Sequence, residues 1–207
     1  MGLGLVSATT ISASNAPLGG VLSAVAMWVC MGGAVIFAFT RGRPAGLMRL
    51  RAIDLLWGAS FGLGLRLLQG GLSGSGAEPF PSAATLDGSL SLEWWFTTGL
   101  ASGGIAPFVE EFFFRAVVLI AIYQVLRRAV GGVAAGFTAT LASAGGFVLF
   151  HAAFNPATLV DSIQLFAVGA VCGVLVLLTG RIWGAVLVHI CYNVSYLVLV
   201  VVATAFR

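Results

Sequence analysis

Charged side chains are rare in this chain, and their scarcity is the strongest constraint on what it can fold into. Only 8% of the 207 residues are charged, as 10 basic and 7 acidic side chains, while 59% are hydrophobic. A soluble domain has about 25% charged residues and needs them to cover its surface. The composition therefore excludes a water-soluble globular enzyme, a disordered chain and a nucleic-acid-binding chain. The surface must face lipid.

Apolar runs separated by helix breakers predict an all-α, polytopic integral membrane bundle of about six transmembrane helices, at about 20 apolar residues per span. The runs cover residues 18–39, 52–72, 92–126, 132–154, 161–178 and 182–205. The run 92–126 is too long for one crossing of a hydrocarbon core about 30 Å thick. Gly103, Gly104 and Pro107 predict a break there, with a tilted or interfacial helix over 92–106 and a new helix from Pro107.

The arginines concentrate in alternate turns between the runs, which predicts an orientation. Cytoplasmic loops carry an excess of Lys and Arg. If the turn 40–51 is cytoplasmic, seven arginines lie inside: Arg41, Arg43, Arg49, Arg51, Arg127, Arg128 and Arg181. The outer segments then hold Glu78, Asp87, Glu93, Asp161 and Arg207. We expect a multi-pass protein of the bacterial inner membrane with both termini outside.

Few ionisable side chains remain inside the predicted spans. They are Glu110, Glu111, Arg115, His151 and His189, with Asp54 and Arg66 near the ends of their run, where they can pair or reach the interface. An ionisable group in a membrane is costly, so each of these residues is a candidate for function.

Two adjacent glutamates precede an arginine on one predicted helix. Glu111 and Arg115 are four residues apart, so they lie on one helix face and can pair. Glu110 lies about 100° further round the helix. We expect Arg115 to neutralise Glu111 and to leave Glu110 free for proton transfer.

Two histidines and an asparagine complete the candidate cluster. His151 ends the fourth predicted span, and His189 and Asn193 share one face of the sixth. A lone histidine on an apolar face is more often a packing residue, and the His189–Asn193 pair could bind an oxyanion, ligate a metal or bridge helices. Together with the glutamates, however, these residues from three helices predict a joint polar site.

Depth along the helices conflicts with a single site. At 1.5 Å per residue from the cytoplasmic arginines, Glu110 lies roughly 27 Å up, His151 roughly 30 Å and His189 only roughly 12 Å. Helix tilt, the break near Pro107 or a turn at 179–181 recessed into the protein would close this gap. The sequence leaves the three explanations open.

In their order and spacing, the motifs resemble those of the CPBP family, which comprises CAAX proteases and bacteriocin-processing enzymes and is also called the Abi family. The motifs are Glu110-Glu111-x-x-x-Arg115, Phe147-x-x-x-His151 and His189-x-x-x-Asn193, and the stretch 166–183 is also similar. Ala116 departs from the glycine that the family often has after its arginine. The resemblance covers residues 92–201 and implies two parts: 1–91, with two transmembrane helices and an outer loop, and 92–207, a catalytic helical core.

The resemblance implies an intramembrane endopeptidase acting on a CAAX-like or bacteriocin-type peptide or lipidated protein. The expected roles are Glu110 as general base, His151 as water ligand, and His189 with Asn193 as oxyanion donors. Glu111 and Arg115 would support these residues. We expect membrane lipid and the substrate as partners, and no nucleic acid.

No cofactor is needed in this interpretation. Alternatively, Glu110, His151 and His189 ligate Zn²⁺, although the chain has no His-Glu-x-x-His motif. Two other functions also fit the composition: a non-catalytic membrane immunity or partner protein, and a proton-coupled transporter. The absence of an evident internal repeat argues against the transporter.

Overall fold

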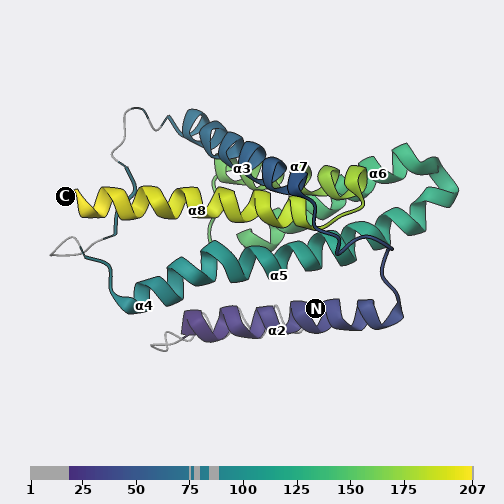
Figure 1. Ribbon diagram of the computed structural model, residues 1–207, viewed down its shortest axis with the longest axis horizontal. Helices are drawn as coiled ribbons and strands as arrows, with labels where there is room; N and C mark the ends of the chain where they lie inside the picture. The colour runs from purple at the N-terminus through teal and green to yellow at the C-terminus, as the bar shows by residue number, and fades with distance from the viewer. Residues whose placement is uncertain (1–18, 75, 77–79, 84–88, 207) are drawn as a thin grey trace.

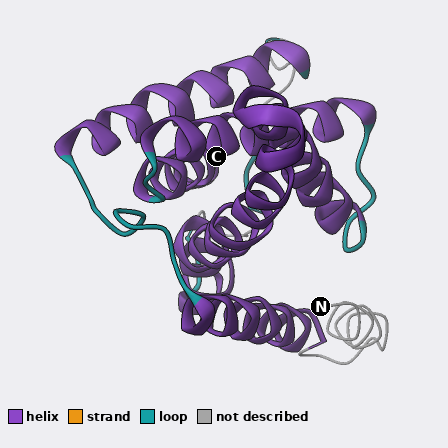
Figure 2. Ribbon diagram, turned by 90° about the vertical axis from the view of Figure 1, so that its right-hand side faces the viewer, coloured by secondary structure: helices purple, strands orange, loops and turns teal. Residues whose placement is uncertain are grey.

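The computed structural model describes residues 19–74, 76, 80–83 and 89–206, and these ranges fold into helices without a strand (Figures 1 and 2). The elements are α2 (Gly19–Arg41), α3 (Ala52–Leu72), α4 (Leu92–Trp94), η1 (Trp95–Ile105), α5 (Ala106–Phe113), η2 (Phe114–Leu119), α6 (Ile120–Ala152), α7 (Leu159–Thr179) and α8 (Trp183–Ala205). The predicted all-α bundle is confirmed. Glu78, Asp87 and Arg207, which entered the predicted orientation, lie outside the described residues.

Three of the described helices, α2, α7 and α8, are long and apolar enough to cross a membrane. The chain is therefore an integral membrane protein, while six as the number of spans remains a prediction. Helix α3 carries two charged side chains, Asp54 and Arg66, and both have partners inside the bundle. The Arg66 guanidinium donates to the Tyr192 carbonyl at 2.6 Å and lies 4.0 Å from the centre of the Tyr192 ring.

The third predicted run forms one continuous helical rod whose winding changes along its length. The π-helical η1 passes into α5 at Ala106, with Pro107 in the first turn of α5. The helix start expected at Pro107 is thus a change from π to α winding, and the chain does not leave the helix there. At Gly131, where φ is +79°, the rod folds back on itself (Figure 1). Glycine adopts such a φ readily because it has no Cβ.

Helices α3 and α8 touch backbone to backbone through two glycines. A Cβ added at Gly58 would lie 2.5 Å from the Leu187 Cβ, and one added at Gly62 would lie 2.5 Å from the Cys191 Cβ. Glycines four residues apart allow membrane helices to approach in this way. The contact fixes the part of α8 that contains His189. Sequence reasoning did not single out this glycine pair.

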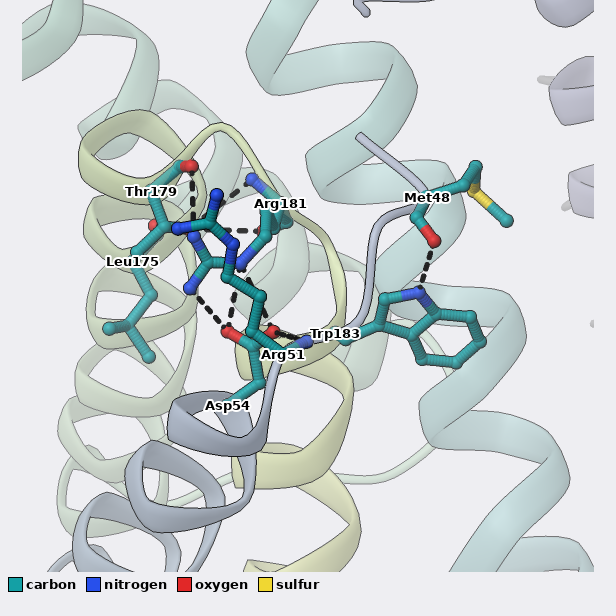
Figure 3. A network of polar contacts seen from close by, with 7 residues as sticks. All are labelled: Met48, Arg51, Asp54, Leu175, Thr179, Arg181 and Trp183. Carbon is teal, nitrogen blue, oxygen red and sulfur yellow. Dashed lines mark hydrogen bonds and ion pairs between the residues drawn. The ribbon is translucent and has the colours of Figure 1, made fainter. Parts of the chain in front are cut away.

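The turn between α7 and α8 is recessed beneath the α2–α3 loop and is held by an ion pair (Figure 3). Arg181 Nη2 donates to Asp54 Oδ1 at 2.7 Å, and its Nε lies 3.1 Å from Asp54 Oδ2. The Asp54 side chain is fully buried, and the Arg181 side chain is 10% exposed. The hydrogen bond to Asp54 raises the pKa of Arg181, so the guanidinium stays charged at any physiological pH.

Backbone contacts secure the same turn to the loop above it. The Ile182 N–H donates to the Leu47 carbonyl at 2.9 Å. The Trp183 indole N–H donates to the Met48 carbonyl at 2.9 Å (Figure 3). Ile182 and Leu47 are both buried. The start of α8 therefore lies inside the protein, which is one of the three arrangements expected to reconcile the depth of His189 with that of Glu110.

Candidate active site

Three of the four expected catalytic side chains lie together: His151 and His189 approach one carboxylate oxygen of Glu110. Glu110 lies on α5, His151 at the end of α6 and His189 on α8. The Glu110 Oε2 atom is 3.9 Å from His151 Nε2 and 4.0 Å from His189 Nε2. Glu110 and His189 are buried, and the His151 side chain is 30% exposed. The depth conflict in the sequence is therefore resolved by the fold.

In each imidazole, the contact that Nδ1 makes determines whether Nε2 donates or accepts a hydrogen bond. His151 Nδ1 lies 3.0 Å from the Phe147 carbonyl, and His189 Nδ1 lies 2.9 Å from Glu111 Oε1. Carbonyl and carboxylate oxygens only accept, so Nδ1 carries the hydrogen in both rings. Each Nε2 is thereby directed at Glu110 across a gap too long for a direct hydrogen bond. A water molecule about 2.8 Å from each atom would bridge such a gap.

Behind these side chains lies the expected Glu111–Arg115 pair. Arg115 Nε is 3.1 Å from Glu111 Oε2, and both side chains are fully buried. The guanidinium also lies over the Phe147 ring, 4.8 Å from its centre. Because the other oxygen of Glu111 contacts His189, the arginine, the glutamate and the histidine form one continuous chain. The predicted ion pair is present in the structure, and Glu111 connects it to His189.

The buried cluster contains two carboxylates and one guanidinium. Arg115 pairs with Glu111, and Glu110 has no arginine partner among the described contacts.

Aromatic and polar contacts fix the helices that carry the site. The Phe147 ring lies against both histidines, with its centre 4.4 Å from that of His151 and 5.5 Å from that of His189. In the π-helical η2, the Phe114 carbonyl accepts a hydrogen bond from the buried Ser143 hydroxyl of α6 at 2.9 Å. These contacts join η2, α6 and α8 next to Glu110.

A cavity of about 380 Å³ opens at the cluster between α2, η1 and the end of α6. Glu110 and His151 lie on its wall, and α2 contributes Ser23, Met27 and Trp28. Sequence reasoning missed this role of α2. The available signal was the spacing of four between Ser23, Met27 and Met31, which places three buried residues on one helix face.

Asn193 lies one turn beyond His189, and its side chain is engaged elsewhere. Its Nδ2 donates to the Ser102 carbonyl at 2.8 Å, and Ser102 lines the cavity. The structure therefore places Asn193 beside the cavity wall, attached to η1. Its role as an oxyanion donor remains a prediction.

The donor set does not fit a metal ion as it is arranged. Among the residues that the structure describes, no group of three His, Cys, Asp or Glu side chains is placed to hold one. Zinc ligands lie about 2.0–2.2 Å from the ion and must surround it closely. Glu110 Oε2 lies 3.9 and 4.0 Å from the two imidazole Nε2 atoms, compared with about 3.3 Å between the ligands of a tetrahedral zinc ion, so the arrangement is wider than a zinc shell.

A comparison with known protein families matches the segment of the chain that carries these side chains. A family model described as Type II CAAX prenyl endopeptidase Rce1-like matches residues 92–195, about half of the chain. The matched segment contains both glutamates, both histidines and Asn193. No curated protein and no solved structure matches the chain. The chain belongs to the Rce1-like type II CAAX prenyl endopeptidases, consistent with the CPBP family of intramembrane proteases, and is a membrane-embedded peptidase.

Proposed function

We propose that this protein hydrolyses a peptide bond in a membrane-associated substrate, of CAAX-like or bacteriocin type, with a water molecule activated by Glu110. The observation that supports this most strongly is the convergence of two imidazole Nε2 atoms on Glu110 Oε2 at 3.9 and 4.0 Å. The carboxylate lies on the wall of a cavity that can admit a peptide. Enclosure within the bundle shields the reacting atoms from bulk water.

In the proposed reaction, Glu110 takes a proton from a water that His151 helps to position. The water oxygen bonds to the carbonyl carbon of the scissile peptide, and the carbonyl π electrons move to its oxygen. The oxyanion electrons then re-form the C=O bond as the C–N bond breaks, and protonated Glu110 gives its proton to the leaving amine. The immediate products are a carboxylic acid and an amine, and transfer of the acid's proton to the amine leaves a carboxylate and an ammonium. No group outside the chain, its substrate and water takes part.

The developing oxyanion is stabilised by His189 and Asn193 in this proposal. His189 can donate from Nε2 only when both of its nitrogens carry hydrogen. The Glu111 carboxylate accepts from His189 Nδ1 at 2.9 Å and holds the ring with Nε2 on the side of Glu110. Asn193 would release the Ser102 carbonyl and turn its amide towards the oxyanion. Donors placed for charge that develops in the transition state contribute strongly to rate.

The test is cleavage of a candidate membrane-linked peptide by purified, reconstituted protein. Glu110→Ala and His151→Ala should abolish cleavage, with an expected loss for the base of about 10²–10⁴-fold, while both proteins still insert and stay folded. Glu93→Ala is the matched control, because Glu93 is exposed and lies before η1. Full cleavage by Glu110→Ala would refute the proposal. Protection against a bacteriocin that survives in both variants would favour the non-catalytic partner.

A further inference from the structure

Arginines gather at one end of the molecule, which we call the arginine end. In Figure 1, the α2–α3 turn and the hairpin within α6 both lie at the right. Arginines occupy these two turns and the α7–α8 turn: Arg41, Arg43, Arg49, Arg51, Arg127, Arg128 and Arg181. Arg181 has Asp54 as its partner. Two of the others, Arg41 and Arg43, face a cavity instead.

This cavity of about 450 Å³ lies between the end of α2, the loop that follows it, and the segment from η2 into α6. Arg41 and Arg43 both line it, and within the described residues no Asp or Glu does. The Arg41 guanidinium lies 5.1 Å from the centre of the Phe37 ring, and neither arginine has an ion-pair partner in the part of the chain that the structure describes. Two cations at one cavity, without an anion, are complementary to a phosphate, which the arginine fork binds through paired hydrogen bonds.

The backbone of the loop holds the two arginines at the cavity. Gly42, between them, has a φ of +144°, which glycine adopts readily because it has no Cβ. Arg43 precedes Pro44, and a residue before proline is restricted to extended conformations. The Pro44 carbonyl accepts from the Leu47 N–H at 3.3 Å, and the Leu47 carbonyl accepts from the Ile182 N–H at 2.9 Å. The loop is thus attached to the bundle, and a ligand there need not order it.

The rest of the lining is mainly apolar, and it indicates which kind of phosphate would fit. Phe39, Val117 and Ile120 line the cavity, and Phe39 and Ile120 also pack against the main buried cluster. Arg41 is the last residue of α2, a helix long and apolar enough to cross a membrane, so the arginines lie where a span meets water. A soluble phosphate would use the arginines and leave the apolar wall bare. A phospholipid would use both, because its phosphate is attached to acyl chains.

We propose that this cavity binds an anionic phospholipid, with its phosphate between Arg41 and Arg43 and the first part of an acyl chain against Phe39 and Ile120. Basic pockets between membrane helices bind lipid headgroups in this way. The lipid joins the end of α2 to the start of α6, two segments far apart in the chain, and so stabilises the folded protein. The active-site glutamates and histidines do not line this cavity, so the inference does not depend on the proposed hydrolase function.

Lipid binding to the delipidated full chain in neutral detergent tests the proposal. Phosphatidylglycerol and phosphatidylcholine with identical acyl chains are titrated, and native mass spectrometry counts the retained lipids. Wild type should retain phosphatidylglycerol preferentially, and Arg41→Gln with Arg43→Gln should weaken its binding about 30-fold. The control, Arg127→Gln with Arg128→Gln, removes the same charge from the hairpin, outside the cavity lining, and should change the affinity by no more than about twofold, because salt screens distant exposed charges. Equal losses in the two double variants, or no preference for phosphatidylglycerol, would overturn the proposal.

A second experiment separates the cavity from its charges and a lipid from a free phosphate. Ala121 lines the cavity and is exposed, so Ala121→Phe should fill the space without changing any charge or unfolding the protein, which thermal unfolding without lipid checks. Phosphatidylglycerol affinity should fall about 10-fold in this variant. An affinity equal to that of wild type would show surface attraction alone and refute the cavity site. Excess glycerol phosphate should leave bound phosphatidylglycerol in place, and displacement would show that the ligand is a free phosphate and not a lipid.

Discussion

Two buried ionic groups in this protein are built in opposite ways. At the arginine end, Asp54 and Arg181 are joined by hydrogen bonds of 2.7 and 3.1 Å, and the Arg51 N–H also donates to Asp54 at 2.8 Å. In the candidate site, Glu110 faces two imidazole nitrogens at 3.9 and 4.0 Å. In the first group, both carboxylate oxygens of Asp54 accept hydrogen bonds from protein groups. The second leaves its reactive atoms unpaired beside a cavity.

The difference separates a charge that stabilises the fold from one that is available for chemistry. A saturated pair cannot accept a proton or a water without losing a strong contact. An open carboxylate can accept both, at a cost in stability that the rest of the structure must offset. Glu111 lies between these extremes, because one of its oxygens contacts Arg115 and the other contacts His189. Variants at each group can test whether the distinction holds.

The largest effect in this set is expected for Asn193→Ala. If its amide stabilises the oxyanion, its loss should lower kcat by about 10²–10³-fold with little change in KM. Steady-state kinetics with a cleaved peptide measures both constants. Gln124→Ala is the control, since it removes an exposed amide at the arginine end. A kcat equal to wild type would leave the oxyanion role to His189 alone.

An intermediate effect is expected for Glu111→Gln. The change removes the carboxylate that contacts His189 Nδ1 and leaves buried Arg115 without its charged partner, so both activity and stability should fall. Breaking a buried pair costs about 3–5 kcal/mol. The double variant Glu111→Gln with Arg115→Met should regain stability in thermal unfolding but stay inactive. Recovery of activity in the double variant would show that Glu111 serves the fold alone.

A smaller effect on activity is expected for Asp54→Asn, which breaks the saturated pair. The Tm should fall because Arg181 loses its partner, and activity should fall only to the extent that α8 shifts and carries His189 with it. Thermal unfolding and kinetics of the same preparation separate the two effects. Adding Arg181→Gln should restore part of the Tm. A loss of activity as large as that of Glu110→Ala, with no change in Tm, would contradict this division of roles.

The smallest effect is expected from metal removal. Because the proposed reaction uses Glu110 and water without zinc, treatment of metal-assayed protein with a chelator should leave the cleavage rate unchanged. Rates before and after chelation, and after zinc is added back, are the measurement. Loss of activity that zinc restores would replace the glutamate mechanism with the metal alternative.

Local patterns were sufficient to predict most of the helices and the identity of the polar cluster. The i,i+4 spacing of Glu111 and Arg115 predicted their pair, because residues four apart share one face of any α-helix. The apolar runs 18–39, 161–178 and 182–205 predicted helices that the structure has at Gly19–Arg41, Leu159–Thr179 and Trp183–Ala205. For Asp54 and Arg66 the sequence left open whether they pair or reach the interface, and it predicted no partner for either.

The sequence by itself determined which side chains had to leave the lipid, since almost every charge outside the turns belongs to the Glu110, His151 and His189 cluster or to an enclosed pair. Tertiary structure alone decided that they meet. The depth of His189 depends on the recessed turn at Arg181 and on the Gly62 contact, and the cavity beside Glu110 depends on α2. Each of these arrangements joins residues far apart in the chain. Helical spacing reports only neighbours within a few turns, so contacts set by packing between distant helices cannot be read from it.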